Sequence, residues 1–152
     1  AKPVLIDPRA FKHPRRDDVL VSLAGPVSNI ILAIFFAWLF KLMLIYAPGW
    51  FELKNYGEAL FGMMLNFILI NIGLAVFNLI PIPPLDGSHL IAALIPEGQE
   101  SLKIYFYRYG SMALLLVILL QGFFEIDILP IGKGIQMLAN WIFSLIGLGI
   151  RF

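Results

Sequence analysis

The stretch ALFGMMLNFILINIGLAVFNLIPIPPLDG, residues 59–87, decides the fold, because it runs without a charge as far as Asp86 and is broken by prolines near its end. About 20 apolar residues cross a bilayer as a helix. Prolines 81, 83 and 84 remove three backbone donors and forbid a continuous helix. Non-helical backbone at membrane depth is tolerated only where protein buries it or where it lines a cavity. The sequence therefore predicts a membrane span over 59–95 that is interrupted and resumes as a shorter helix at about Asp86.

Three further stretches lack Asp, Glu, Lys and Arg, over residues 19–40, 109–124 and 134–150. The chain has 152 residues, of which 60% are hydrophobic and 14% charged, whereas an average soluble domain carries about 25% charged residues. This composition predicts an all-α, polytopic helical membrane protein with one transmembrane domain over 19–152. We expect four transmembrane segments, over residues 19–47, 59–95, 109–129 and 134–150.

Several other classes of protein are excluded by composition. Lys and Arg number 11 against 10 Asp and Glu, so a net charge of +1 offers no basic surface for nucleic acid. The absence of cysteine excludes disulfides, thiol nucleophiles and cysteine zinc sites. The chain starts at Ala1 without the pattern of a signal peptide, and we expect it to begin within a larger protein.

The distribution of basic residues predicts the orientation in the membrane. Residues 1–18 carry three prolines and five basic residues, which indicates a basic loop. Eight of the eleven Lys and Arg lie in this loop, in the loop over 97–108 and at Arg151. The two alternate loops contain Lys54 and Lys133. Because positive residues concentrate on the cytoplasmic side, we expect the N-terminal loop to be cytoplasmic.

The position of Asp86 within a predicted membrane segment needs an explanation, because placing an ionised carboxylate there carries a large free-energy cost. Three roles are compatible with it. The carboxylate could cap the helix that resumes after Pro84, because Asp is a favoured N-cap residue. It could instead bind a cation, or relay protons in a transporter. Capping does not exclude metal binding, so the residues alone leave these roles open.

Three other polar residues deserve comparison with Asp86. The Asn78 amide could bond the interrupted backbone, which is the more ordinary role, or a bound substrate. His89 follows Asp86 by one helical turn, but one carboxylate and one imidazole are too few for a catalytic zinc site. We therefore expect His89 to pack or to form a hydrogen bond. His13 precedes Pro14 in a predicted loop, and we expect no fixed site there.

Residues 77–91, FNLIPIPPLDGSHLI, resemble the N-x-x-P-x-x-x-L-D-G motif of the site-2 protease family, the intramembrane zinc metalloproteases. The matching positions are Asn78, Pro81, Leu85, Asp86 and Gly87. Upstream, residues 1–33 look like the segment that follows the second core helix in the compact bacterial and archaeal branch of the family. The resemblance covers residues 1–96 through its motifs and the last two predicted helices only by placement.

The resemblance implies a reaction and its residues. It implies that Asp86 is the third zinc ligand, beside two histidines of an H-E-x-x-H helix, in a site where zinc activates water for peptide hydrolysis. Asn78 would lie near the substrate backbone, and Pro81, Pro83 and Gly87 would shape a segment able to pair with an unwound substrate strand. The implied partners are membrane lipid and a transmembrane or signal-peptide protein substrate, in the plasma membrane of a prokaryote.

No H-E-x-x-H sequence occurs in the 152 residues. We therefore expect this chain to be the C-terminal part of the protease, separated from its general base and inactive by itself. Two alternatives stay open: an ion-coordinating transporter or channel module, and a non-catalytic membrane partner derived from the protease. A transporter with inverted repeats would carry a second broken helix in a symmetric position, and the sequence has none.

Labelling of single cysteines tests the predicted orientation. The chain has no cysteine of its own. In intact cells, Lys12→Cys or Gln99→Cys should be shielded from an impermeant thiol reagent, whereas Asn55→Cys should react. The opposite labelling pattern would overturn the orientation.

Overall fold

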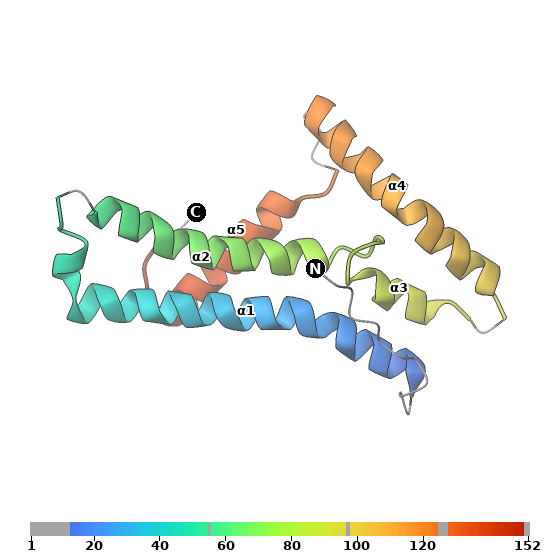
Figure 1. The fold of residues 1–152 in the computed structure, drawn as a ribbon, viewed down its shortest axis with the longest axis horizontal. Coiled ribbons are helices and arrows are strands. Elements are labelled where there is room, and N and C mark those ends of the chain that lie inside the picture. Colours follow the sequence, from blue (N-terminus) through green and yellow to red (C-terminus); the bar gives the residue numbers. More distant parts are fainter. Residues whose placement is uncertain (1–12, 55, 97, 125–127, 151–152) are drawn as a thin grey trace. The chain divides into compact units, whose positions relative to one another are not determined.

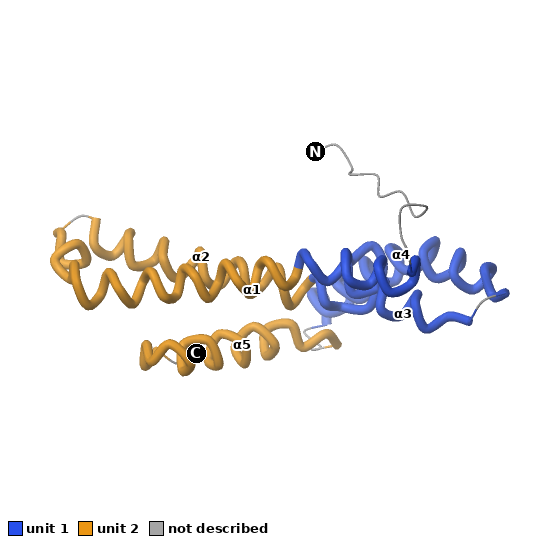
Figure 2. The backbone as a smooth tube through the Cα atoms, turned by 90° about the horizontal axis from the view of Figure 1, so that it is seen from below, with its two compact units in different colours: residues 1–25, 78–126 blue, residues 26–77, 127–152 orange. Residues whose placement is uncertain are grey.

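A computed structural model describes residues 13–54, 56–96, 98–124 and 128–150. These residues form helices and no strand, which confirms the predicted all-α class. The elements are α1 (Pro14–Tyr46), the 3-10 turn η2 (Pro48–Trp50), α2 (Gly57–Asn78), α3 (Ser88–Leu94), α4 (Glu100–Phe124) and α5 (Ile131–Ile146) (Figure 1). The chain divides into two compact units, one of residues 1–25 and 78–126, the other of residues 26–77 and 127–152 (Figure 2).

Helix α1 begins at Pro14, earlier than the predicted start at residue 19. Proline is favoured in a first helical turn, where its missing N–H would have no helical partner. The N–H of His13 donates a hydrogen bond to the Asp17 carboxylate at 3.1 Å, and the N–H of Asp17 donates to the His13 carbonyl at 2.9 Å. The loop predicted over 1–18 is therefore wrong from Pro14 onward, because proline and charge here start a helix. Residues 1–12 lie outside the described part.

The core of the second unit is built from one face each of α1, α2 and α5. Its buried residues recur at the spacings of three and four that place side chains on one helix face. They are Ala33, Ala37, Phe40, Met64, Ile68, Ile72, Ala139, Ile142, Phe143 and Ile146. The Nζ of Lys41 donates a hydrogen bond to the Ile146 carbonyl, which has no partner within its own helix. Helix α5 is thereby fixed against α1 within this unit.

Three described helices, α1, α2 and α4, are long and apolar enough to cross a membrane. Large apolar side chains along them stay exposed, among them Trp38, Ile70 and Met112. Lipid is the solvent that such surfaces require, and the chain is an integral membrane protein. The fourth predicted segment corresponds to α5, which begins at Ile131 and has 16 residues. At about 1.5 Å per residue, it is shorter than the roughly 30 Å of a hydrocarbon core.

Helix α4 begins at Glu100, so the loop predicted as far as residue 108 is wrong. An acidic residue in the first turn favours a helix start, and polar and aromatic residues at an interface suit a helix as well as a loop. Further along α4, Gly110 is buried beside Pro83. A Cβ at Gly110 would lie 2.6 Å from the proline Cδ. The missing side chain thus lets the Pro83 ring pack directly on the helix.

Replacing Gly110 with alanine should lower thermal stability. An exposed Gly→Ala change in a helix stabilises it by about 1 kcal/mol, but overpacking against a rigid ring costs about 1–3 kcal/mol. The control is Gly122→Ala on the same helix, where an added Cβ meets nothing within 4 Å. Thermal melts in detergent should give Gly110→Ala the lower midpoint, and equal midpoints would contradict the contact.

Candidate functional site

The helix that carries the sequence motif is interrupted, as predicted. Helix α2 ends at Asn78 and α3 begins at Ser88, so residues 79–87 are not helical. The chain resumes its helix at Ser88 rather than at Asp86. The three prolines of the segment have no N–H and cannot join a helical hydrogen-bond ladder, which accounts for the interruption.

Short-range hydrogen bonds fold the interrupted segment. The N–H of Ile82 donates to the Ile80 carbonyl at 2.9 Å, and the N–H of Leu85 donates to the Ile82 carbonyl at 3.1 Å. The N–H of Gly87 donates to the Asn78 carbonyl at 2.6 Å, which closes the segment onto the end of α2. Backbone groups at membrane depth need such partners because no water is available to replace them.

Gly87 has a steric reason for being glycine. A Cβ at this position would contact the Leu79 carbonyl and would lie 2.7 Å from the carbonyl oxygen of Ile80. Both contacts are with backbone atoms, which cannot move aside as the end of a flexible side chain can. The closure of the segment onto α2 therefore depends on the missing side chain at Gly87.

The Asp86 carboxylate does not cap α3. The N-cap residue is Gly87, which has no side chain to cap the helix, and no described side chain takes its place. The first N–H groups, of Ser88 and His89, donate instead to the main-chain carbonyls of Leu85 and Asp86. The Asp86 side chain is partly exposed, and none of the described side chains donates a hydrogen bond to it. Of the roles open to Asp86, capping is the one that this geometry does not support.

A polar cluster next to Asp86 joins three helices of the first unit. Oδ2 of Asp18 on α1 and Nδ1 of His89 on α3 lie 2.8 Å apart. From α4, the Tyr107 ring contacts the His89 ring at a centroid distance of 6.0 Å, and its hydroxyl forms a hydrogen bond with the Ser88 side chain. The expected hydrogen-bonding role of His89 is confirmed, with Asp18 as its partner.

Sequence reasoning missed Asp18, Ser88 and Tyr107 as members of this cluster. Asp18 and His89 are 71 residues apart, and periodicity relates positions within one helix but not between helices. The one usable signal was the position of Asp18, the last charged residue before a long apolar stretch. An acid at the edge of a membrane segment indicates a partner nearby, but does not identify it.

The remaining predicted site residues lie along the same segment. Asn78 is half-buried at the end of α2, and within the described residues its side-chain amide forms no hydrogen bond. Pro81 is exposed, whereas Pro83 is fully buried. Asn78 and Pro81 are therefore accessible from outside, while Pro83 supports the segment from within.

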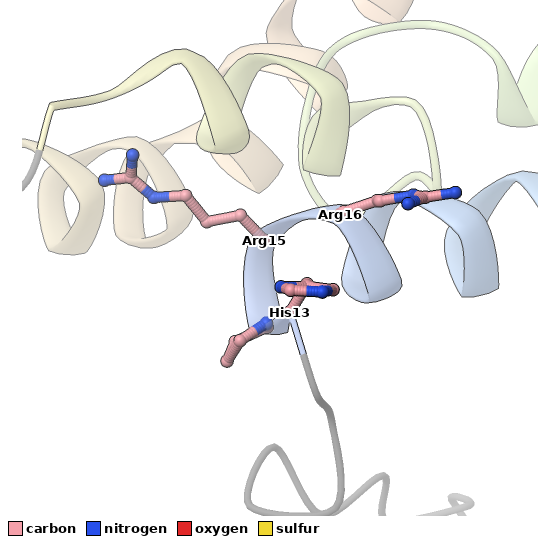
Figure 3. A pocket seen from close by; sticks show the side chains of 4 residues that line it. His13, Arg15 and Arg16 are labelled. Atoms are coloured by element: carbon pink, nitrogen blue, oxygen red, sulfur yellow. The ribbon is translucent and has the colours of Figure 1, made fainter.

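A surface hollow at the start of α1 is lined by His13, Pro14, Arg15 and Arg16 (Figure 3). Figure 3 shows the side chains of Arg15 and Arg16 extending in opposite directions. The Arg15 Nη2 donates a hydrogen bond to the carbonyl of Ile95, just beyond α3, at 3.1 Å. The hollow contains none of the predicted site residues, and Arg15 serves to tie α1 to α3.

The described side chains near Asp86 do not form a complete metal site. The described residues contain no group of three or more His, Cys, Asp or Glu that could hold a metal ion. A catalytic zinc usually takes three protein ligands. Asp86 suits one ligand position, since its carboxylate is partly exposed and lacks a donor partner among the described side chains, whereas His89 is engaged with Asp18. The described part of the chain therefore does not hold a complete zinc site.

The sequence pattern of Peptidase family M50 matches residues 52–120, which include the whole interrupted segment and Asp86. Over these residues the chain is similar to the site-2 protease family. It is 40% identical over 117 residues to a protein of Bacillus subtilis named "Putative zinc metalloprotease YwhC". The match covers 77% of the chain and 52% of the relative, so the chain spans about half the length of that protein.

Two further relatives match over shorter segments. A protein of Methanocaldococcus jannaschii named "Putative zinc metalloprotease MJ0611" is 42% identical over 71 residues, covering 47% of the chain and 31% of the relative. The protein named "Protease RseP" of Photorhabdus luminescens is 39% identical over 54 residues, covering 32% of the chain and 24% of the relative. No solved structure matches the chain.

The 152-residue chain should bind zinc weakly, because metal affinity depends on the number and geometry of the ligands. Metal analysis of the chain, purified in detergent and washed with a chelator, should find much less than one zinc per protein. Stoichiometric zinc that is lost in both Asp86→Asn and His89→Gln would instead reveal an Asp86–His89 site.

Proposed function

We propose that this chain is the C-terminal part of an intramembrane zinc metalloprotease that cleaves transmembrane or signal-peptide substrates, and that Asp86 supplies one of the zinc ligands. The other two ligands and the general base would come from an H-E-x-x-H helix outside these 152 residues. On this proposal the chain is inactive by itself. Similarity to a family whose relatives carry the name zinc metalloprotease supports the reaction class.

The state of Asp86 is the observation that carries the proposal. Its carboxylate belongs to a non-helical segment, caps no helix and receives no hydrogen bond from a described side chain. An anionic oxygen ligand in an otherwise apolar stretch is stabilised by a cation, which offsets the loss of hydration. A purely structural aspartate would be expected to have a donor partner, as Asp17 and Asp18 have.

The residues around Asp86 would serve the substrate. Zinc, when bound, supplies the activation of water and the polarisation of the peptide carbonyl. The Asn78 amide forms no hydrogen bond within the described residues, so it can donate to and accept from a peptide group of the substrate. Pro81 is exposed, and its carbonyl would accept a hydrogen bond from an extended substrate strand, in the manner of strand addition at a sheet edge. Pro83 and Gly87 would keep the segment in shape, because both are buried.

The same proposal includes the topology. We place the N-terminal loop on the cytoplasmic side of a prokaryotic plasma membrane, on the distribution of Lys and Arg. Helices α1, α2 and α4 would span the bilayer with α5 as a fourth, short segment packed against α1 in its unit. Lipid would cover the exposed apolar side chains of these helices.

Asp86→Asn in the full-length protein tests the ligand assignment. The variant keeps the shape of the side chain and removes its charge. Since Asp86 caps nothing, stability should change by no more than about 0.5 kcal/mol, while zinc content drops and cleavage of a membrane-embedded substrate falls by orders of magnitude. Wild-type zinc content together with wild-type cleavage would refute the assignment and favour a non-catalytic or transport role.

Asn78→Ala tests the substrate role separately. Cleavage should fall while zinc stays bound, because the amide is assigned to the substrate and not to the metal. Asn66→Ala is the matched control, since Asn66 is an exposed amide on the same helix, and it should cleave at the wild-type rate. Loss of zinc in Asn78→Ala, or equal cleavage by the two variants, would refute this role.

A further inference from the structure

Helix α1 places a residue without a side chain directly against the Asp86 carboxylate. A Cβ added to Gly25 would lie 2.9 Å from Oδ2 of Asp86 and 3.9 Å from its Cγ. A separation under 3.0 Å is closer than a real Cβ approaches such an atom. The Asp86 oxygen therefore occupies space that any other residue at position 25 would fill.

This contact differs in kind from those of the other tightly packed glycines. At Gly87 an added Cβ would meet backbone carbonyls, and at Gly110 it would meet a rigid proline ring. At Gly25 it would meet only the end of the Asp86 side chain, which can rotate away without moving the backbone. A side chain at position 25 would therefore displace the carboxylate oxygen and leave the fold intact.

Two other contacts fix α1 beside this segment. Asp18, Ser22 and Gly25 follow one another at the i, i+4 and i+7 spacing, so they share one face of the helix. Asp18 at one end of this face binds His89 on α3, and Gly25 at the other end meets Asp86. Arg15 binds the Ile95 carbonyl at the far end of α3. The helix is thereby held in register, and the position of Gly25 against Asp86 is defined.

We propose that Gly25 is a positioning residue for Asp86, which admits the carboxylate oxygen to the surface of α1 and so sets where that oxygen is presented to the metal. The inference rests on the proposed ligand role of Asp86. It assigns to α1 a function beyond spanning the membrane, since one turn of this helix defines the location of a ligand atom carried by another segment.

Zinc content and stability of full-length Gly25→Ala test the proposal together. Mutation of a residue that orients a metal ligand typically costs about 10–100-fold in metal affinity or activity, so zinc affinity should fall by that range in Gly25→Ala, and cleavage should fall with it. The thermal midpoint should stay the same or rise, because alanine favours a helix more than glycine does. Gly122→Ala, whose added Cβ meets nothing within 4 Å, should keep wild-type zinc affinity and cleavage.

Asp86→Asn, measured in parallel, separates the two proposals. Loss of zinc in Asp86→Asn with wild-type affinity in Gly25→Ala would overturn the role of Gly25 and leave the ligand assignment standing. Wild-type zinc affinity in Asp86→Asn would overturn the ligand assignment and, with it, the positioning role. A Gly25→Ala protein that loses zinc and also melts well below the wild type would contradict the positioning role, because the loss of zinc would then follow from a destabilised fold.

A crosslink tests the contact without zinc or activity. The 152-residue chain has no cysteine, so Gly25→Cys combined with Asp86→Cys introduces one possible disulfide. The Gly25 Cβ position lies 3.9 Å from the Asp86 Cγ, whose place the sulfur of a cysteine at position 86 would take, so the two introduced thiols would lie within reach of each other. Ala24→Cys with Asp86→Cys is the control, since the neighbouring residue points about 100° away around the helix. Equal crosslinking of the two pairs, or none in the first, would contradict the contact.

Discussion

Backbone groups that leave a helix at membrane depth must find partners within the protein, and the segment between α2 and α3 is organised around this constraint. An unsatisfied N–H or C=O in hydrocarbon costs several kcal/mol, so an interruption survives only if nearly every donor is paired or absent. Pro81, Pro83 and Pro84 meet part of the requirement by having no N–H to satisfy. Turn hydrogen bonds meet another part, and the bond from Gly87 to the Asn78 carbonyl closes the segment.

The same constraint explains why glycines gather around the segment. A non-helical stretch has no regular ridge of side chains that packs into the groove of a neighbouring helix. Its close approach to neighbouring helices therefore depends on glycines, which have no Cβ. Gly87 lets the segment approach its own backbone, Gly110 receives the Pro83 ring, and Gly25 receives the Asp86 carboxylate. Helix α1 precedes the interrupted segment in the sequence and α4 follows it, yet both contact this segment.

The sequence predicted the interruption well, because proline acts locally and its effect needs no knowledge of distant contacts. Helix ends were less predictable. Pro14 and Glu100 lie in stretches that were predicted as loops because of their prolines and charges. Proline and acidic residues are also favoured in the first turn of a helix, and both α1 and α4 start earlier than predicted. Aspartate is favoured at the N-cap position, so the sequence suggested that Asp86 could cap the resumed helix. In the structure Gly87 takes the N-cap position instead. Asp18, the partner of His89, could not be predicted from the sequence. A contact between two helices depends on how they are aligned along each other, and no local sequence pattern encodes that alignment.

On the proposed role of Asp86 as a zinc ligand, it matters that its carboxylate does not cap α3. A capping carboxylate is held by the N–H groups of its helix and gains about 1 kcal/mol from them, which a metal would have to displace. At the start of α3 the main-chain carbonyls of Leu85 and Asp86 accept those N–H groups instead. The orientation of the carboxylate is thus limited by α1 at Gly25 and, among the described side chains, not by hydrogen bonds. Steric limits restrict where an anion lies without neutralising its charge, so the full charge stays available to a cation. On the proposed ligand role, such a carboxylate would combine a sterically restricted position with a negative charge that no described side chain neutralises.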